Sequence, residues 1–384
     1  MKAPKRLLSL LLLTFVLVMS TLSLPAHAFA STSEPDLTEA QSAIVCDDAG
    51  NVLWSKDADA EMPMASITKI MTAMVALDSG VSMDTVCQLG DLTLDENAQL
   101  AGYKSGTTAT FGDLMRVMLV YSANDAATYV AREVAGSEDA FVDLMNQKAQ
   151  ELGMTHTHFK NVHGLEEDGH YSSASDLVIM GRYAMLNYPF IRKMVHTSPI
   201  TVDVNGVATS FETTDELMGL YDGMLGIKTG AIDGSYTFLG CSSRDGVTLY
   251  TAVLGCSTKW GRFQDTENLM DWAYDTYSDR TLASPASGVV IYPFAYHFGY
   301  SCVLTADSKT DGMVWPDGED VTYTKVIAKS GTLTVPSSTL GVCLWTQSGR
   351  VVGATSYTTS AKLVRTPSFG PFNSLLFTNL TDAA

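Results

Sequence analysis

The sequence predicts an α+β fold: one mixed domain followed by a small all-β domain. Two observations predict it. Strand patterns lie at both ends of a block of helical patterns, which is typical of a sheet that distant parts of the chain close together. From about Asp279 the helical periodicity disappears, and short β-branched or aromatic runs alternate with Gly, Pro, Ser and Asp. We therefore expect the mixed domain at 35–278 and the β-rich domain at 279–384.

The elements of the mixed domain follow in chain order. Two apolar runs around the turn residues Asp-Asp-Ala-Gly-Asn predict a hairpin at 43–55. Apolar residues at helical spacing, with Ser caps and first-turn acids such as Asp176, then predict helices over 66–76 and from Phe111, Asn124, Ser137 and Ser173. The runs "SYTFLGCSS" and "VTLYTAVLGCS", joined by "RDG", predict a second hairpin. A helix over about 262–277 closes the region. The helical spacing of Met71, Met74, Met115 and Met118 predicts core positions.

The first 28 residues have the pattern of an export signal. A basic "MKAPKR" precedes 18 apolar-rich residues at 7–24, and "AHA" follows at 26–28. We expect 1–28 to be a cleaved signal peptide and the mature protein to act outside the cytoplasm. The alternative is an uncleaved anchor, since 18 residues just reach the spanning range, but the Ser and Thr interruptions favour cleavage.

Charge excludes one class of partner. The formal net charge is −18, and it becomes −21 without residues 1–28. Such an acidic chain does not hold nucleic acid or an anionic membrane by bulk electrostatics. An anionic ligand must instead be met by a few basic residues in a local site.

The six cysteines contain no Cys-x-x-Cys pair and no zinc spacing. Export permits disulfides, but a domain of this size does not need them. Cys302 and Cys343 are one candidate pair, because both lie in the β-rich segment; free buried thiols are the alternative.

The predicted helix from Ser66 contains a lysine that needs an explanation. In 67–77 the only non-apolar residues are Thr68, Lys69 and Thr72, so the helix should be buried on nearly all sides. Lysine is almost never buried without a partner, and Ser66 lies three residues earlier on the same helical face. By itself the pair usually means a helix cap and a lysine that reaches solvent.

Two further motifs change this interpretation. Ser122 begins the Ser-x-Asn of "YSANDAA", and Lys-[Ser/Thr]-Gly occurs three times, at Lys104, Lys228 and Lys329. Order and context select Lys228, because Lys104 precedes Ser122 and Lys329 belongs to the β-rich segment. Ser-x-x-Lys, Ser-x-Asn and Lys-Thr-Gly in this order form the signature of the β-lactamases and penicillin-binding proteins.

The flanking sequences narrow the resemblance. "PMASITKIMTA", "YSANDAA", "LMNQKAQELGMTHTHFKNVHGL", "GHYSSASDL", "GIKTG" and "GRFQDTENLM" occur in order and cover about 64–270. The chain thus resembles the low-molecular-mass penicillin-binding proteins of the serine D-alanyl-D-alanine carboxypeptidase family. This resemblance implies a β-lactamase/transpeptidase-like domain, an antiparallel sheet flanked by helices with a helical subdomain, and a small second β domain. Two departures are Ser173 in place of the family's usual Thr and the absence of a basic amphipathic segment at the C-terminus, which leaves peripheral membrane association open.

The resemblance implies catalytic roles that the residue types support. Ser66 would be the nucleophile, activated by a base within hydrogen-bond reach. Lys69 would be that base, with a pKa lowered by apolar neighbours and by a second cation, Lys228. Ser122 would relay the proton to the departing amine. The backbone N–H groups of Ser66 and Ala231 would form the oxyanion hole.

The remaining roles concern substrate binding, and the family assigns them by position. Asn124 would hold the substrate amide, and Lys228 and Thr229, followed by Gly230, would bind the terminal carboxylate together with Arg262. The reaction would be attack on the penultimate D-Ala carbonyl of a peptidoglycan stem peptide, release of D-alanine and hydrolysis of the acyl-enzyme. Penicillins and other β-lactams should acylate the same serine. No cofactor or metal is implied.

Three alternative functions fit the sequence less well. His156, His158, His163 and His170 lie near Glu166 and Asp168, but their spacing fits no common metal-ligand pattern. A β-lactamase would need a deacylating base, yet no Glu-x-x-Leu-Asn lies between Ser122 and Lys228, and no Tyr-x-Asn stands at the second motif. A non-catalytic wall-binding relative is disfavoured by the intact Ser66 and Lys69.

Overall fold

The computed structural model describes residues 34–94, 98–285, 289–293, 300–315, 320–327 and 339–365. The predicted signal peptide at 1–28, Lys329 and the C-terminal segment after 365 lie outside these residues. No helix within the described ranges is long and apolar enough to span a membrane.

A five-stranded antiparallel sheet organises the mixed region, with strand order β2-β1-β9-β8-β7. The strands are β1 (Ser42–Asp47), β2 (Val52–Lys56), β7 (Met224–Ile232), β8 (Ser235–Arg244) and β9 (Val247–Cys256). β1 pairs with β9, with Ser42 opposite Leu254. Both predicted hairpins are confirmed, and so is the closure of the sheet by the two ends of the region.

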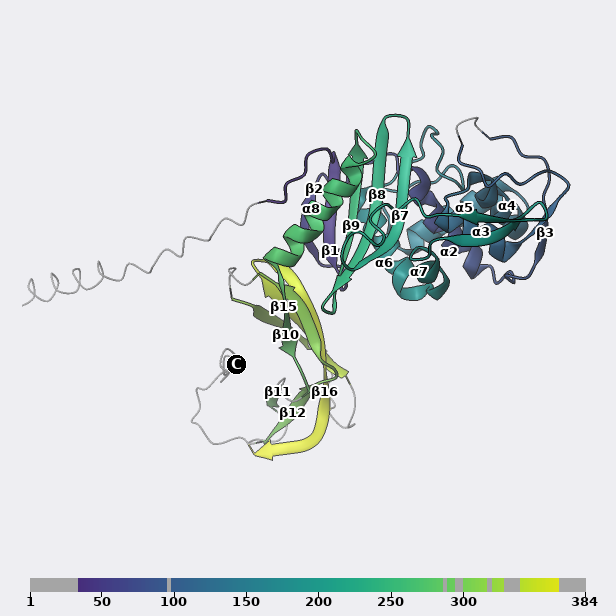
Figure 1. The fold of residues 1–384 in the computed structure, drawn as a ribbon. Helices are drawn as coiled ribbons and strands as arrows, with labels where there is room; N and C mark the ends of the chain where they lie inside the picture. The colour runs from purple at the N-terminus through teal and green to yellow at the C-terminus, as the bar shows by residue number, and fades with distance from the viewer. Residues whose placement is uncertain are drawn as a thin grey trace, which may run out of the picture.

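Alternating residues of β1 explain why helices cover both faces of the sheet. Ala43 and Val45 pack with the residues of α8 (Gly261–Thr276), whereas Ile44 and Cys46 join the larger core under the other helices. Successive side chains of a strand point to opposite faces, and all six residues of β1 are buried. Figure 1 shows α8 against one face of the sheet and the helical region beyond the β7 edge.

Apart from the short helix α7, which was not predicted, the helices agree with the sequence prediction except at Ser66. They are η1 (Ala65–Ile67), α2 (Thr68–Asp78), α3 (Phe111–Val120), α4 (Asn124–Ala135), α5 (Glu138–Glu151), α6 (Ala174–Asn187) and α7 (Pro189–Met194). Ser137 and Ser173 cap α5 and α6 through their side chains, and the four methionines predicted to be core are fully buried. The helix expected from Ser66 begins at Thr68, because Ala65 has a φ of 49° and a 3-10 turn precedes α2.

Several elements were not predicted. They are the short helix α7 and the strands β3 (Val86–Gln88), β4 (Thr108–Thr110), β5 (Ile200–Val204), β6 (Val207–Phe211) and β7. Four of these strands have five residues or fewer. β7 contains two glycines, Gly226 and Gly230, which weaken a strand pattern.

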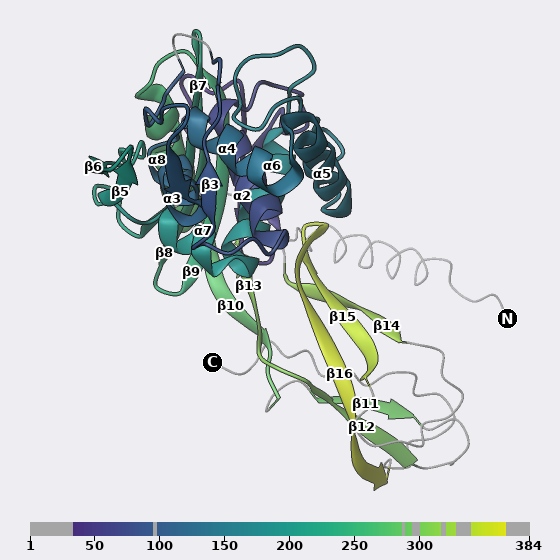
Figure 2. The same cartoon turned by 90° about the vertical axis from the view of Figure 1, so that its right-hand side faces the viewer.

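The C-terminal region is all-β within the described residues, as expected. β10 (Ser278–Ala283) pairs with β13 (Thr310–Val314). A second sheet has the order β11-β12-β16-β15-β14 and contains β11 (Val289–Pro293), β12 (Tyr300–Ala306), β14 (Thr322–Ile327), β15 (Thr339–Gln347) and β16 (Arg350–Arg365). Figures 1 and 2 show this region projecting away from the end of α8.

The proposed pairing of Cys302 with Cys343 is wrong. β16 separates their strands, and Cys302 lies opposite Leu363 whereas Cys343 lies opposite Thr355. Eight residues along a strand span roughly 26 Å, far beyond the 7 Å limit between the Cα atoms of a disulfide. Elsewhere in the described chain, Cys46, Cys87, Cys241 and Cys256 are buried free thiols, and burial raises the pKa of each to about 12.

Candidate active site

Ser66 lies half-buried in the 3-10 turn that precedes α2. The turn is strained, since the preceding residue, Ala65, has a left-handed φ of 49°, and such a conformation costs a non-glycine residue about 1–3 kcal/mol. Gly164 packs directly against the backbone of this turn. A Cβ added to Gly164 would collide with the carbonyl oxygen of Ala65 and would lie 2.8 Å from the backbone nitrogen of Ser66. Only glycine permits this approach.

Lys69 is fully buried on α2 and points at Ser66. Its Nζ lies 2.8 Å from Ser66 Oγ, 2.5 Å from Asn124 Oδ1 and 2.6 Å from the carbonyl oxygen of His163. Desolvation is the main cause that brings the pKa of Lys69 well below its ordinary value, and the charge of Lys228 lowers it further. The serine is therefore the partner of a buried lysine, and the cap interpretation does not hold.

Ser122 and Asn124 occupy the turn between α3 and α4. Ser122 is buried and has a left-handed φ of 71°, and Asn124 is the first residue of α4. Asp125, also buried, accepts hydrogen bonds from the backbone N–H groups of Ala101 and Gly102, both at 2.9 Å. These bonds fix the loop before α3 to the start of α4.

The third motif lies on β7, the edge strand of the sheet. Lys228 is buried, and its Nζ donates to the Thr229 carbonyl oxygen at 3.0 Å. Burial, and then the charge of Arg262, lower the pKa of Lys228 to about 7. A Cβ on Gly230 would lie 2.8 Å from the carbonyl oxygen of Met64, so the β7 edge lies against the strained turn. Ala231 follows and is exposed.

Arg262 approaches β7 from the first turn of α8. It is buried, its Nη1 donates to the Gly230 carbonyl oxygen at 2.7 Å, and its Nε has no hydrogen-bond partner. Desolvation lowers its pKa to about 10. The guanidinium stays charged at neutral pH, so two buried cations face this part of the sheet.

The structure thus joins most of the nine predicted residues. Hydrogen bonds connect Ser66, Lys69 and Asn124, and a second contact group consists of Lys228, Thr229, Gly230 and Arg262. The electrostatic coupling of Lys69 with Lys228 relates the two groups. Within the described residues, Ser122 makes no hydrogen bond with either of them.

The fold and these motifs agree with what is found in known proteins. The sequence profile described as D-alanyl-D-alanine carboxypeptidase matches residues 29–258, more than half of the chain. The chain belongs to the D-alanyl-D-alanine carboxypeptidase family.

Individual relatives of this carboxypeptidase support the assignment. D-alanyl-D-alanine carboxypeptidase DacF of Bacillus subtilis is 32% identical over 285 residues, which cover 72% of this chain and 73% of the relative. DacC of Escherichia coli is 28% identical over 356 residues, which cover 88% of this chain and 85% of the relative. The chain is therefore a serine D-Ala-D-Ala carboxypeptidase, a hydrolase of the penicillin-binding protein group.

Solved structures confirm the fold. Penicillin-binding protein 5 of Haemophilus influenzae superposes with a TM-score of 0.73 at 21% identity, covering 86% of this chain and 99% of that one. Penicillin-binding protein D2 of Listeria monocytogenes, solved with cefotaxime bound, superposes with a TM-score of 0.57 at 32% identity. The match covers 63% of this chain and 100% of that one.

Sequence reasoning missed residues that shape this carboxypeptidase's site. The carbonyl oxygen of His163 and the glycine after it support Lys69 and Ser66, and Thr214 places its hydroxyl 2.5 Å from that of Thr229. A glycine following "NVH" was the only available signal for the first pair. A backbone carbonyl has no residue-type signature, and Thr214 lies in a segment without a motif.

The histidine-rich segment of the carboxypeptidase serves the turn beneath Ser66. His170 Nδ1 accepts from the Lys160 N–H at 3.0 Å, so its Nε2 donates to Thr68 Oγ1 at 2.8 Å. Burial lowers the pKa of His170 to about 4. Within the described chain no group of three or more His, Cys, Asp or Glu side chains could hold a metal ion. Lys104, the earlier Lys-Ser-Gly, is exposed, and its backbone binds Asn205.

Proposed function

We propose that this carboxypeptidase works through a Ser66 acyl-enzyme, with Lys69 as the base. Ser66 Oγ attacks the penultimate D-Ala carbonyl of a peptidoglycan stem peptide, and its proton passes to Lys69. D-Alanine leaves as the amine, and water then hydrolyses the ester. The observation that carries the proposal is the fully buried Lys69 amine 2.8 Å from Ser66 Oγ.

The contacts of Lys69 suit a neutral amine. A neutral amine has two N–H donors and one lone pair. Asn124 Oδ1 and the His163 carbonyl oxygen both act as acceptors, and together they use the two donors. The lone pair is then left for the hydroxyl proton of Ser66, so these two oxygens orient the base as well as hold it. The lowered pKa of Lys69 favours this neutral form.

Three further groups complete the chemical steps. Ser122 relays the proton from Lys69 to the departing amine. The backbone N–H groups of Ser66 and Ala231 stabilise the oxyanion, a role supported by the close approach of β7 to the turn that carries Ser66. Asn124, whose Oδ1 faces Lys69, offers its amide N–H₂ to the substrate backbone.

The second group of residues binds the C-terminal carboxylate of the substrate. Lys228 and Arg262 supply positive charge, Thr229 supplies a hydroxyl donor, and Gly230 leaves space at the strand edge. Support comes from the burial of both cations beside this edge in a chain whose net charge is −18. Charge of the required sign is concentrated where the anionic end must dock.

Partners and location follow from the same chemistry. We infer that β-lactams acylate Ser66, which is supported by the cefotaxime-bound structure of the Listeria relative. The enzyme would act outside the cytoplasm, at the cell wall or at the outer face of the cytoplasmic membrane, after removal of residues 1–28. We further infer a catalytic domain at 35–278 and a β-rich domain from 279, supported by the start of β10 at Ser278.

One experiment tests the proposal. The mature protein is incubated with diacetyl-L-Lys-D-Ala-D-Ala, and the released D-alanine is measured for the native enzyme and for Ser66→Ala. Release that survives in Ser66→Ala would refute the acyl-enzyme. Fast turnover of a chromogenic cephalosporin would indicate a β-lactamase instead, whereas slow labelling of Ser66 supports a penicillin-binding protein. No release by a folded native protein would favour a non-catalytic binding role.

A further inference from the structure

Asp215 is a buried carboxylate outside the sequence motifs. It lies in the segment 212–223 between β6 and β7 and is 5% exposed. Its Oδ1 accepts from the Leu217 N–H at 2.9 Å, but its Oδ2 is buried and has no hydrogen-bond partner. A buried charged oxygen without a partner is destabilising. Some compensating interaction is therefore expected nearby.

The compensating charges are Arg262 and Lys228. Both favour the ionised form of Asp215, and Asp215 in turn favours the charged forms of both cations. Arg262 Nε is likewise buried without a partner. No ion pair of 4.0 Å or less joins Asp215 to either cation in the described structure, so the three groups interact through the protein interior.

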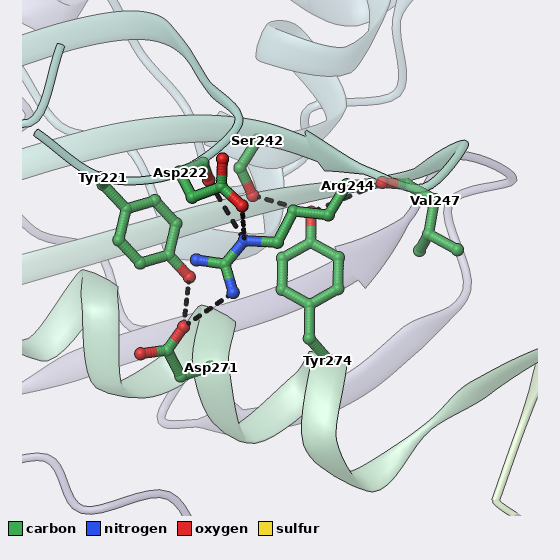
Figure 3. A network of polar contacts seen from close by, with 7 residues as sticks. All are labelled: Tyr221, Asp222, Ser242, Arg244, Val247, Asp271 and Tyr274. Atoms are coloured by element: carbon green, nitrogen blue, oxygen red, sulfur yellow. Dashed lines mark hydrogen bonds and ion pairs between the residues drawn. The ribbon is translucent and has the colours of Figure 1, made fainter. Parts of the chain in front are cut away.

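The segment 212–223 is held at one end by a site residue and at the other by α8. Next to Asp215, the Thr214 hydroxyl touches that of Thr229. At the far end, Tyr221 donates to Asp271 at 2.7 Å. Figure 3 shows Arg244 over the Tyr221 ring while it reaches Asp271 on α8 at 3.1 Å. Asp215 therefore has a fixed position relative to the cations.

We propose that Asp215 is a positioning residue for the substrate carboxylate: its buried negative charge increases the fraction of enzyme in which Lys228 is charged, so that the carboxylate meets two cations and not one in more of the molecules. This inference rests on the proposed role of Lys228 and Arg262 in substrate binding. It assigns Asp215 an effect on binding that depends on pH, with no contact to the reacting atoms.

The sign of the effect follows from the charges around Lys228. Burial and Arg262 lower the pKa of Lys228 to about 7, and Asp215 opposes this. Burial raises the pKa of Asp215 itself to about 6, so its help exists only above about pH 6. The other charges facing the group are Glu216, which acts on Arg262 and pairs with exposed Lys259, and Lys69, which is coupled to Lys228. None of them replaces Asp215 at Lys228.

The test compares Asp215→Asn with a matched control, Glu212→Gln, an exposed acid of the same segment. KM and kcat are measured from pH 5 to pH 8 with diacetyl-L-Lys-D-Ala-D-Ala and with its C-terminal amide. If the pKa of Lys228 falls by about one unit, KM of Asp215→Asn for the free acid rises roughly tenfold at pH 8. At pH 5 the KM matches the native value. We expect Asp215→Asn to leave kcat, and KM for the amide substrate, unchanged. Glu212→Gln should match the native enzyme in all measurements. Asp215→Glu should restore most of the native KM for the free acid.

The outcomes separate the inference from the proposed function. A native enzyme that does not prefer the free acid over the amide refutes carboxylate binding by Lys228 and Arg262, and the inference with it. A native preference with an unchanged KM in Asp215→Asn refutes the inference alone. A loss that is equal at all pH values and for both substrates also refutes it, because it indicates support of the fold only. If Asp215→Asn does not fold, Asp215→Ser is scored by the same criteria.

Discussion

The site contains two buried lysines whose surroundings differ in kind. Lys69, on the helical side, contacts two carbonyl-type oxygens and the Ser66 hydroxyl. Lys228, on the sheet side, contacts one carbonyl oxygen, and besides desolvation its pKa is affected by the charges of Arg262 and Asp215. Both are at least 98% buried.

The difference shows that a buried lysine can be suited either to a neutral or to a charged role. Desolvation lowers the pKa of both lysines. Each lysine also has a buried carboxylate that favours its charged form, Asp125 for Lys69 and Asp215 for Lys228. The direct contacts differ: Lys69 lies within hydrogen-bond distance of the Ser66 hydroxyl, as the proposed base requires, whereas Lys228 donates to the Thr229 carbonyl oxygen. The immediate neighbours, more than the depth of burial, thus suit each lysine to its proposed role.

The strongest test applies one substitution to both lysines. Lys69→Arg should lower kcat/KM for the tripeptide by about 10³-fold or more, because guanidinium does not act as a base near neutral pH. Lys228→Arg keeps a cation, so we expect a loss of roughly tenfold, mainly in KM. D-Alanine release measures both variants, and Lys104→Arg, in the exposed Lys-Ser-Gly at 104–106, is the control. Equal losses at the two sites would remove the distinction between them.

A second test concerns the support of the Lys69 side. Gly164→Ala forces a Cβ against the Ala65 carbonyl and should displace Ser66, which lowers acylation by a fluorescent penicillin by about 10²-fold. Gly153→Ala is a matched control, since Gly153 also has a positive φ, 75°, but nothing within 4 Å of an added Cβ. If the two variants lose acylation equally, backbone strain and not the contact with the turn explains the effect.

The third test uses pH. We expect kcat/KM to rise with pH as Lys69 loses its proton and to fall as Lys228 loses its own near pH 7. Because the two lysines interact, the rising and falling limbs of this pH profile report apparent pKa values of the pair and not of either residue alone. Lys228→Arg should move the falling limb to higher pH and leave a rising limb. A falling limb that stays in place would assign it to another group.

The smallest effect is expected at the anchor of the segment 212–223. Arg244→Ala removes a cation that lies over the rings of Tyr221 and Tyr274, 4.3 and 4.8 Å from their centroids, and pairs with Asp271. We expect the free energy of unfolding to fall by about 1–2 kcal/mol, as measured by urea denaturation. Arg116→Ala, which breaks an i,i+3 pair with Asp113, should cost about 0.5 kcal/mol. A loss at Arg244 no larger than this would mean that the stacking contributes little.

Sequence reasoning predicted the residues that carry chemistry better than the backbone that positions them. Side chains with a defined spacing, such as Ser66 and Lys69, are visible because helical geometry relates their positions. The strain at Ala65, the carbonyl of His163 and the buried Asp215 were not predictable, since they depend on tertiary packing between separate segments and not on spacing within one element. The sequence left the pairing of Cys302 with Cys343 open for the same reason, because only the strand order and register exclude it.

The pairing of β1 with β9 has a consequence for the assembly of the enzyme. About 200 residues separate these neighbours, and Arg262 comes later still, so the central sheet cannot close until most of the mixed region has emerged during synthesis or export. Contacts this distant in sequence slow folding. Ser66, the proposed nucleophile, therefore lies in a complete site only after β9 has joined the sheet, and a chain truncated before β9 should neither cleave a stem peptide nor react with penicillin.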